Sequence, residues 1–495
     1  MSMNDGRVRF GHDPLFESLH PCVMRRFDLC VIGSGAGGQR AAIQAAKLGK
    51  SVAVVEAHEV VGGAAVNTGT IPSKALREAI MSIGGHPGSS PTTADFNLAA
   101  KQATMGNLWA SCGRVIQAEI DMVNRHFAHN GICLIHGYGR FKDPHTLEIC
   151  GEHVTEAIHA EHFVIAVGTR PTRPPNIQFD DTDIITSDEL IRLRNLPHSM
   201  IIVGGGVIGT EYASMLAALG IKITLVEGRP RLLDFVDSEI IEAFHYHLRT
   251  QGVTLRLGEK VVSIRKAEPP KHARTSNNIM AEATLESGKV LRADCLLYCI
   301  GRQGATNGLD LANAGLSADE RGRIKVNECY QTAVPHIYAC GDVIGFPALA
   351  STSMEQGRLA ACHMFGQRHD LMENLLPYGI YAIPEISMVG WTEDKLTAEG
   401  VPYEAGIAYY RETARGQLLR DEIGMLKLLI HQESHAVLGV HIIGTHATEL
   451  VHIGQAAIAF RATAEYFVNT VFNYPTLAEC YKVAALNGLN KLRNI

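Results

Sequence analysis

Apolar residues along this chain fall into short runs separated by Gly-rich turns and Ala-rich stretches, and one such arrangement occurs twice. Residues 27–56 read as an apolar run, a Gly-rich turn, an Ala-rich helical stretch, a glycine and a second apolar run that ends in Glu56. Residues 199–227 repeat this order and end in Glu227. The spacing from the first turn glycine to the closing glutamate is the same in both copies, because 56 − 33 and 227 − 204 both equal 23. The pattern predicts two strand–helix–strand units and therefore an α/β fold with parallel sheets.

The turn of each copy carries a GxGxxG motif between a strand and a helix, which is the context that dinucleotide binding requires. The first glycine allows the tight turn, the second lets the backbone approach a pyrophosphate, and the third lets the helix pack on its strand. The pyrophosphate then lies at the helix N-terminus, where free N–H groups attract an anion, and the acidic residue accepts hydrogen bonds from a ribose. We therefore predict two Rossmann-like dinucleotide sites, built from Gly33, Gly35, Gly38 and Glu56 and from Gly204, Gly206, Gly209 and Glu227.

Length and charge narrow the function classes. A chain of 495 residues exceeds the size of a single core, so two or three domains are expected. The net charge of −6 argues against nucleic acid as a main partner. No apolar run reaches the roughly 18 residues that a membrane span needs, so no membrane partner is expected. The N-terminus lacks the apolar core of a secretory signal, and residues 1–24 are interpreted as an extension before the first strand.

Cysteine and histidine patterns indicate neither disulfides nor a metal site. The eleven cysteines form no CxxC pair, which favours the reducing cytoplasm, and Cys295 and Cys299 lie in an apolar run typical of a buried strand. The histidines at 245–247 and at 441, 446 and 452 lack a completing ligand set, so they are interpreted as surface or core residues.

Two further segments bring in a resemblance. FVIAVGTRP (163–171) is an apolar strand that ends in Gly168, and HIYACGDVIG (336–345) places Asp342 after another strand. Together with the repeat, they make the chain resemble the glutathione-reductase-like flavoprotein family. The resemblance implies FAD in the first fold, with Asp342 at the ribityl chain of the flavin, and NAD or NADP in the second. It adds four glycines to the cofactor sites: Gly62, Gly63, Gly168 and Gly301.

The resemblance also implies a domain organisation. The FAD-binding domain would comprise residues 25–172 and 305–372, and the NAD(P)-binding domain residues 173–304. Residues 373–495 would form an α+β domain that builds a homodimer.

The thiol chemistry of that family is missing from this chain. Disulfide reductases carry GGxCxxxGCIPSK beside the flavin, whereas this sequence has Ala65 and Thr70 at the two cysteine positions. Thiol–disulfide exchange needs an attacking and a leaving thiolate, which neither residue supplies. Near the C-terminus, Tyr474 stands at the position of the acid–base histidine, before Pro475 and Glu479. One interpretation is an inactive relative of the disulfide reductases. The joint loss of both halves favours a changed function.

Three segments narrow the resemblance to one group. GTIPSKALRE, the stretch from NAGLSADERGR to HIYACGDVIGFPALAS, and EYFVNTVFNYPTLAECYKVAALNGLNKL are similar to the soluble pyridine nucleotide transhydrogenases, in which tyrosine also replaces the histidine. This resemblance implies hydride transfer between NADPH and NAD⁺ through FAD, of the Si-specific type. Two departures stand out: relatives often keep the first cysteine, here Ala65, and tend to have a neutral residue where this chain has Glu227.

The resemblance also assigns catalytic residues. Lys74 would lie beside flavin N5 and pair with Glu211 of the second Gly-rich helix, and Arg302 is a weaker candidate near the cofactors. Glu227 suits the free 2′-hydroxyl of NAD, whereas Arg229 and Arg231 can accommodate the 2′-phosphate of NADP. Alternatively, the two arginines are ordinary solvated charges.

Two other functions stay open at this point. The chain could be a flavin-dependent NAD(P)H dehydrogenase that passes electrons to a quinone, a dye or oxygen, because such acceptors need only access to the flavin. It could also be a non-catalytic flavoprotein that senses redox state.

Overall fold

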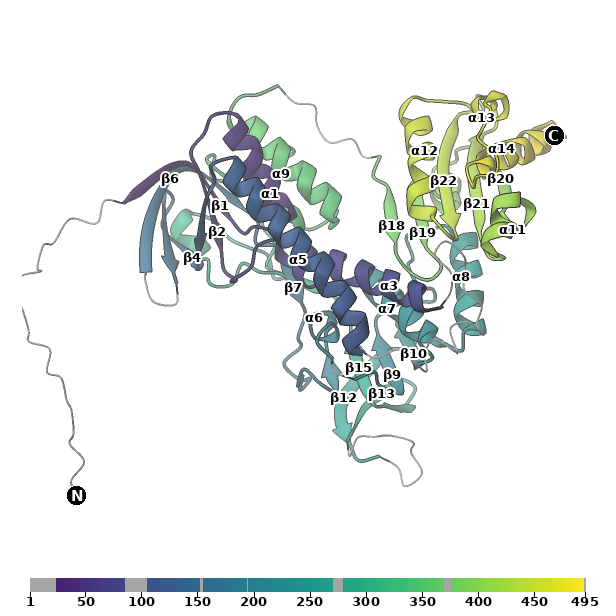
Figure 1. Cartoon of the computed structure of the whole chain (residues 1–495), viewed down its shortest axis with the longest axis horizontal. Coiled ribbons are helices and arrows are strands. Elements are labelled where there is room, and N and C mark those ends of the chain that lie inside the picture. Colours follow the sequence, from purple (N-terminus) through teal and green to yellow (C-terminus); the bar gives the residue numbers. More distant parts are fainter. Residues whose placement is uncertain are drawn as a thin grey trace, which may run out of the picture.

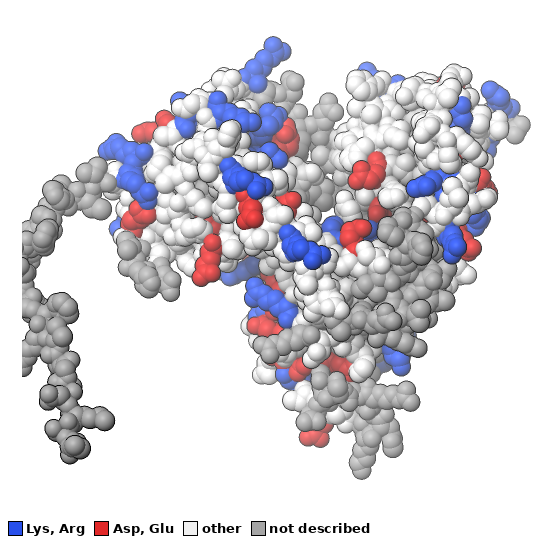
Figure 2. Space-filling view, viewed as in Figure 1, with Lys and Arg blue, Asp and Glu red and all other residues white. Residues whose placement is uncertain are grey.

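The computed structural model describes residues 24–84, 105–151, 155–193, 195–269, 279–368 and 375–493. The predicted N-terminal extension lies outside the described residues, apart from Met24. No helix in the described ranges is both long enough and apolar enough to span a bilayer. On the face shown in Figure 2, basic and acidic side chains are interspersed.

The first sequence copy forms a parallel strand–helix–strand unit at the centre of a seven-stranded sheet (the first fold). Strands β1 (Arg25–Ile32) and β2 (Val52–Glu56) pair in parallel on either side of the crossover through helix α1 (Ala36–Lys47). The strand order is β3-β2-β1-β6-β5-β4, with β17 paired to β6. The other strands are β3 (Cys133–His136), β4 (Tyr138–Asp143), β5 (Thr146–Cys150), β6 (Thr155–Ile165) and β17 (Ile337–Ala339). Helix α1 packs against α9 (Ala350–Met364), which lies beside it in Figure 1.

The second copy forms the same unit in a separate five-stranded sheet (the second fold). Strands β9 (Ser199–Val203) and β10 (Lys222–Glu227) flank helix α7 (Val207–Ala218), and the order is β11-β10-β9-β15-β8. The remaining strands of this sheet are β8 (Ile184–Ile185), β11 (Thr254–Leu257) and β15 (Cys295–Tyr298). Helix α8 (Ser238–Thr250) follows β10, and a meander of β12 (Val261–Ala267), β13 (Met280–Leu285) and β14 (Val290–Ala293) packs nearby.

A third unit follows toward the C-terminus (the C-terminal fold). Its antiparallel sheet has the order β18-β19-β22-β21-β20. Its strands are β18 (Tyr378–Ile380), β19 (Ile386–Gly390), β20 (Tyr403–Tyr409), β21 (Met425–His431) and β22 (Val437–Ile443). Helix α12 (Ala447–Ala459) packs on β19 and β22, and α14 (Glu479–Leu492) packs on β20 and β21. The predicted α/β class with an α+β C-terminal unit is confirmed. The predicted domain boundaries stay a prediction.

Helices of the first fold bring the three units together. Helix α3 (Thr70–Gly84) packs against α5 (Met105–His129), and both run from the first sheet toward the second fold in Figure 1. Leu76 and Ile80 of α3 share one apolar core with Leu216 of α7, Phe244 of α8 and Ile383 of the C-terminal fold. Residues on α3 can therefore contact both other units.

Candidate functional site

The Gly-rich turn after β1 leaves no room for a side chain at Gly33 or at Gly38. Gly33 has a φ of +102°, and a Cβ at this position would lie 2.5 Å from the carbonyl oxygen of Ala166. A Cβ at Gly38 would lie 2.0 Å from the carbonyl oxygen of Gly33. Gly35 is the N-cap of α1 without a side-chain cap, and it faces Gly63 so closely that a Cβ on Gly63 would lie 2.7 Å from it. Backbone N–H groups at a helix N-terminus, approachable past bare glycines, fit the pyrophosphate of a dinucleotide.

The turn after β9 has the same geometry. Gly204 has a φ of +112°, a Cβ at Gly209 would lie 1.9 Å from the carbonyl oxygen of Gly204, and Gly206 is the N-cap of α7 without a side-chain cap. The sequence repeat is thus also a structural repeat, and both turns fit a dinucleotide.

The closing glutamates are anchored alike. The carboxylate of Glu56 accepts hydrogen bonds from the backbone N–H groups of Ser34 (3.0 Å) and His58 (3.0 Å). Glu227 accepts from the backbone N–H groups of Gly205 (2.6 Å) and Arg229 (2.9 Å). Both carboxylates are buried and face the Gly-rich loop of their own fold.

The two copies differ in what else contacts these carboxylates. The hydroxyl of Ser34 donates to Glu56 at 2.5 Å and accepts from the N–H of Gly62 at 2.9 Å, so it joins the loop to the segment before α2 (Gly63–Asn67). In the second fold this position is Gly205, where a Cβ would lie 2.4 Å from the Leu232 side chain. The sequence pattern did not single out Ser34.

Glu227 is paired with an arginine instead. The Nε and Nη2 atoms of Arg229 donate to its two carboxylate oxygens at 3.0 and 3.1 Å. Burial alone would raise the pKa of Glu227, but Arg229 and the backbone donors outweigh it and hold that pKa below its ordinary value. Arg229 also donates to Asp234 at 2.6 Å, and Arg231 donates to Asp394 at 2.9 Å. Both arginines are therefore ion-paired at the closing end of β10.

Lys74 and Glu211 form the predicted pair across the two folds. The ammonium nitrogen of Lys74, on α3, lies 3.1 and 3.0 Å from the carboxylate oxygens of Glu211, on α7. Glu211 is 3% exposed, whereas the side chain of Lys74 is 25% exposed. Tyr381 completes the cluster, because its N–H donates to Glu211 at 2.8 Å and its ring centroid lies 4.8 Å from the Lys74 nitrogen. No local pattern marks Tyr381, since the contact joins distant parts of the chain.

Asp342 and Gly168 are linked through one threonine. Thr169, directly after Gly168, donates its hydroxyl to Asp342 at 3.0 Å and accepts a hydrogen bond from Arg302 Nε at 2.8 Å. Strands β7 (Thr169–Pro171) and β16 (Arg302–Gly304) pair here, where the chain passes between the first and second folds. Gly301, next to Arg302, has a φ of +81°. The structure therefore brings four sequence-predicted residues together where the chain passes between the two folds: Gly168, Gly301, Arg302 and Asp342.

The positions of the missing thiols hold no sulfur. Ala65 lies in α2 and Thr70 begins α3, next to the turn that carries Lys74. The cysteines within the described ranges are all free. Burial raises the pKa of Cys299 to about 12, so this thiol at the edge of the core stays protonated at neutral pH. Tyr474 is 68% exposed, and Glu479 begins α14 on the C-terminal fold.

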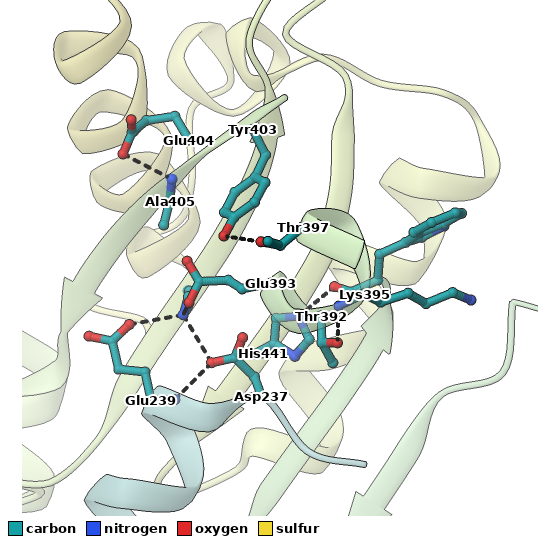
Figure 3. Close-up of polar contacts among 12 residues, drawn as sticks. Asp237, Glu239, Thr392, Glu393, Lys395, Thr397, Tyr403, Glu404, Ala405 and His441 are labelled. Atoms are coloured by element: carbon teal, nitrogen blue, oxygen red, sulfur yellow. Dashed lines mark hydrogen bonds and ion pairs between the residues drawn. The ribbon is translucent and has the colours of Figure 1, made fainter. Parts of the chain in front are cut away.

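One cluster of three carboxylates among the described residues has the spacing of a metal site, but the ammonium group of a lysine side chain occupies it. Asp237, Glu239 and Glu393 lie close together, and the Nζ of Lys427 contacts them at 2.9, 2.9 and 2.7 Å (Figure 3). Lys427 and Asp237 are fully buried, and buried His441 lies beside them. This network joins α8 of the second fold to the C-terminal fold.

Comparison with known proteins agrees with this architecture. The family model described as pyridine nucleotide-disulphide oxidoreductase matches residues 27–357, and the model for the dimerisation domain of that family matches residues 376–485. The Cu(II) complex of the flavoprotein disulfide reductase RclA from Escherichia coli superposes with a TM-score of 0.82 at 25% identity, covering 94% of this chain and 99% of that one.

Curated relatives have a higher sequence identity to this chain than that structure does. The soluble pyridine nucleotide transhydrogenase of Mycobacterium tuberculosis (strain ATCC 25177 / H37Ra) is 50% identical over 95% of this chain and 98% of its own. The protein of the same name from Marinomonas sp. (strain MWYL1) is 45% identical over 94% of this chain and 99% of its own. The chain therefore belongs to the soluble pyridine nucleotide transhydrogenases, within the pyridine nucleotide-disulphide oxidoreductase family.

Proposed function

We propose that this chain binds FAD in the first fold and transfers hydride between NADPH and NAD⁺ bound in turn at the second. The observation that carries the proposal is the Lys74–Glu211 pair, which joins the two nucleotide-binding folds where α2 and α3 contain no cysteine. The transhydrogenase relatives support the same activity. When bound, FAD supplies the chemistry, because it accepts a hydride from one nucleotide and returns it to another.

The residues of the chain would orient the FAD and the nicotinamide nucleotide and stabilise the charge that develops during hydride transfer. Gly33, Gly35, Gly38, Gly62 and Gly63 would hold the FAD pyrophosphate, with Glu56 at the ribose and Asp342 and Gly168 at the flavin side. Gly204, Gly206, Gly209 and Gly301 would hold the nicotinamide nucleotide. Lys74 would place a fixed positive charge where negative charge develops during hydride transfer, which is the main way a preorganised site lowers a barrier.

The charges near Glu227 suit an enzyme that accepts both nucleotides. A lone carboxylate would repel the 2′-phosphate of NADP, but Arg229 compensates that charge in place. The guanidinium group is partly exposed, so it can also reach a phosphate, and Arg231 lies two residues further along. One site would then bind NAD and NADP with modest discrimination, as an alternating mechanism requires.

The decisive experiment is an anaerobic assay of the purified FAD-loaded protein with NADPH and a thio-analogue of NAD⁺. We expect steady reduction of the analogue at a rate that is unaffected by exhaustive alkylation of accessible thiols, and no reduction of glutathione disulfide or lipoamide. If NADPH reduces the flavin but only a quinone, dye or oxygen reoxidises it, the protein is an NAD(P)H dehydrogenase. Robust turnover of a disulfide would contradict the meaning given to Ala65, Thr70 and Tyr474.

Three finer features belong to the same proposal. Si-specificity predicts that deuterium is lost from NADPH labelled at the pro-S position of C4 and is retained in NADP⁺ when the label is at the pro-R position. The match to a dimerisation domain supports a homodimer built by the C-terminal fold, which sedimentation of the holoenzyme tests. We also propose a cytoplasmic location, tested by fractionation of the source cells.

A further inference from the structure

A short segment of the C-terminal fold, residues 381–385, is fastened to helices of both nucleotide-binding folds. From α3, Arg77 donates to the carbonyl oxygen of Ala382 at 3.0 Å and forms an ion pair with Glu385 at 3.1 Å. From α7, the hydroxyl of Ser214 accepts a hydrogen bond from the N–H of Ile383 at 3.0 Å. Arg77, Glu385 and Ser214 are all buried. The segment is therefore held firmly against both helices.

Tyr381 begins this segment and contacts both members of the Lys74–Glu211 pair. Its N–H donates to Glu211 Oε1 at 2.8 Å, the oxygen that Lys74 also contacts at 3.1 Å. Its ring lies under the ammonium group of Lys74, with 4.8 Å between the nitrogen and the ring centroid. Besides the hydroxyl of the adjacent Ser73 at 3.3 Å, the ammonium group is thus bound by a carboxylate and by an aromatic face, which come from different folds.

We propose that Tyr381 is a positioning residue for Lys74, which fixes the direction of the ammonium group and preserves its positive charge toward the flavin. The inference rests on the proposed function, because it takes Lys74 to stabilise charge during hydride transfer.

Two physical effects support this role. A lysine side chain has many rotamers, and a single ion pair leaves several of them open, whereas a second contact of fixed geometry removes most of that freedom. The two contacts also differ in charge. The aromatic quadrupole attracts a cation without formal negative charge. The N–H of Tyr381 meanwhile donates a hydrogen bond to the Glu211 carboxylate, so the negative charge of Glu211 compensates less of the positive charge of Lys74. Burial raises the pKa of Tyr381, so its ring stays neutral near pH 7.

The test compares variants at position 381 by two measurements, the rate of flavin reduction in stopped flow and the reduction potential of the bound flavin. Tyr381→Leu removes the ring and keeps the backbone N–H. We expect it to slow reduction about five- to thirtyfold, equivalent to roughly 1–2 kcal/mol at 1.36 kcal/mol per tenfold, and to make the potential more negative. Tyr381→Phe keeps the ring and should restore both values. Tyr378→Leu is the matched control, because it removes a ring from the same strand region whose described ring contacts are Phe235 and Phe346.

A double variant separates positioning from general packing. In a Lys74→Met background, Tyr381→Leu should change neither measurement further, since the group it positions is gone. An equal loss in both backgrounds overturns the inference, as does a Tyr381→Leu variant with the rate and potential of the wild type. Fluorinated phenylalanines at position 381 weaken the ring quadrupole at nearly constant shape, so the rate should fall stepwise with fluorine number. A flat series also overturns it, and this series serves if the leucine variant fails to fold.

The outcome is separable from that of the proposed function. If NADPH never reduces the NAD⁺ analogue but the Tyr381 series still tracks Lys74 in flavin reduction, then the transhydrogenase proposal fails and the positioning role stands. If transhydrogenation proceeds and the series is flat, only the positioning role fails.

Discussion

At the scale of single residues, the site is governed by how each charge is compensated. Lys74 contacts one carboxylate, one hydroxyl and one aromatic ring, and a quarter of its side chain remains exposed. An ammonium group that is held but incompletely neutralised is suited to act on a group bound beside it.

Replacing Lys74 by methionine should therefore slow flavin reduction by roughly 10², the order found when one preorganised charge stabiliser is removed. FAD should stay bound, because the predicted pyrophosphate and ribose contacts lie on the Gly33–Gly38 turn and Glu56. Stopped-flow reduction and the flavin-to-protein ratio measure the two effects. Lys47→Met, which changes an exposed lysine at the end of α1, is the control. An unchanged reduction rate would make Lys74 an ordinary partly solvated charge.

The pair Glu227–Arg229 predicts the nucleotide preference. Arg229→Ala leaves a buried carboxylate without its cation, so the kcat/KM for NADPH should fall by at least about tenfold and that for NADH much less, with a larger difference at low salt. Glu227→Gln should raise the efficiency with NADPH. It should lower that with NADH, since a hydrogen bond to a charged group is worth roughly 1.5–3 kcal/mol.

Steady-state kinetics with both nucleotides checks this pair of expectations, with Arg249→Ala on the exposed end of α8 as the control. A wild-type protein that ignores NADPH, together with an Arg229 variant that behaves normally, would point to an NADH-specific dehydrogenase.

At the scale of elements, the repeat was predictable and its surroundings were not. The strands and helices of both copies followed from apolar runs and glycines, because the turns after β1 and β9 tolerate no other residue at Gly33, Gly38 and their counterparts. Helix α8 shows where such reasoning ends. The HYH stretch was interpreted as surface or core, and the structure buries His245 and His247 but leaves Tyr246 between them 72% exposed. Only the packing of α8 decides this.

These two histidines predict an acid-sensitive second fold. Burial lowers the pKa of His245 and of His247 to about 4, below the roughly 6.5 of an unfolded chain. As pH falls from about 6.5 toward 4, the unfolded state takes up protons that the folded state refuses. Each histidine then lowers the free energy of unfolding by about 1.4 kcal/mol per pH unit, and this loss of stability is absent above pH 6.5. The thermal midpoint should fall over this window. His245→Gln should flatten the decline, whereas His452→Gln, on an exposed position of α12, should not. Parallel curves for all three proteins would contradict the assignment.

At the scale of the whole molecule, three units meet at contacts that the sequence pattern did not mark. The family and the order of the units were predictable from motifs, and the Lys74–Glu211 pair only from resemblance. Tyr381 and the Lys427 network were not, because each joins residues from different units and has no periodicity of its own. Their geometry follows only from the way α3, α7 and α8 dock on the C-terminal fold.

The Lys427 network predicts how firmly that docking is held. Burial would raise the pKa of Asp237, but its interactions with His441 and with the ammonium group of Lys427 hold that pKa below its ordinary value, so Asp237 remains an anion at neutral pH. Lys427→Met leaves this anion buried without its cationic partner, which typically costs about 3–5 kcal/mol. We expect a lower thermal midpoint and faster proteolysis near the junction.

A second substitution tests the cause. Asp237→Asn removes the charge but keeps an oxygen to cap α8. Combined with Lys427→Met in a double variant, it should therefore restore much of the stability that Lys427→Met alone loses. If the double variant is less stable than Lys427→Met alone, the loss does not arise from an uncompensated charge.

The difference between Ser34 and Gly205 at matching positions suits the first fold to a cofactor that stays bound and the second to a nucleotide that exchanges in every cycle. In the first fold a hydroxyl ties the loop, the glutamate and the following segment into one closed set of bonds. Release of FAD bound against this loop would require these hydrogen bonds to loosen together, so we expect FAD to dissociate slowly. In the second fold Gly205 has no hydroxyl to make such a tie, and Glu227 is held by two backbone N–H groups and by the partly exposed guanidinium group of Arg229. Fewer bonds join this loop to its neighbours, so we expect the nicotinamide nucleotide to exchange faster than FAD, and the rate of that exchange sets how often the catalytic cycle can repeat.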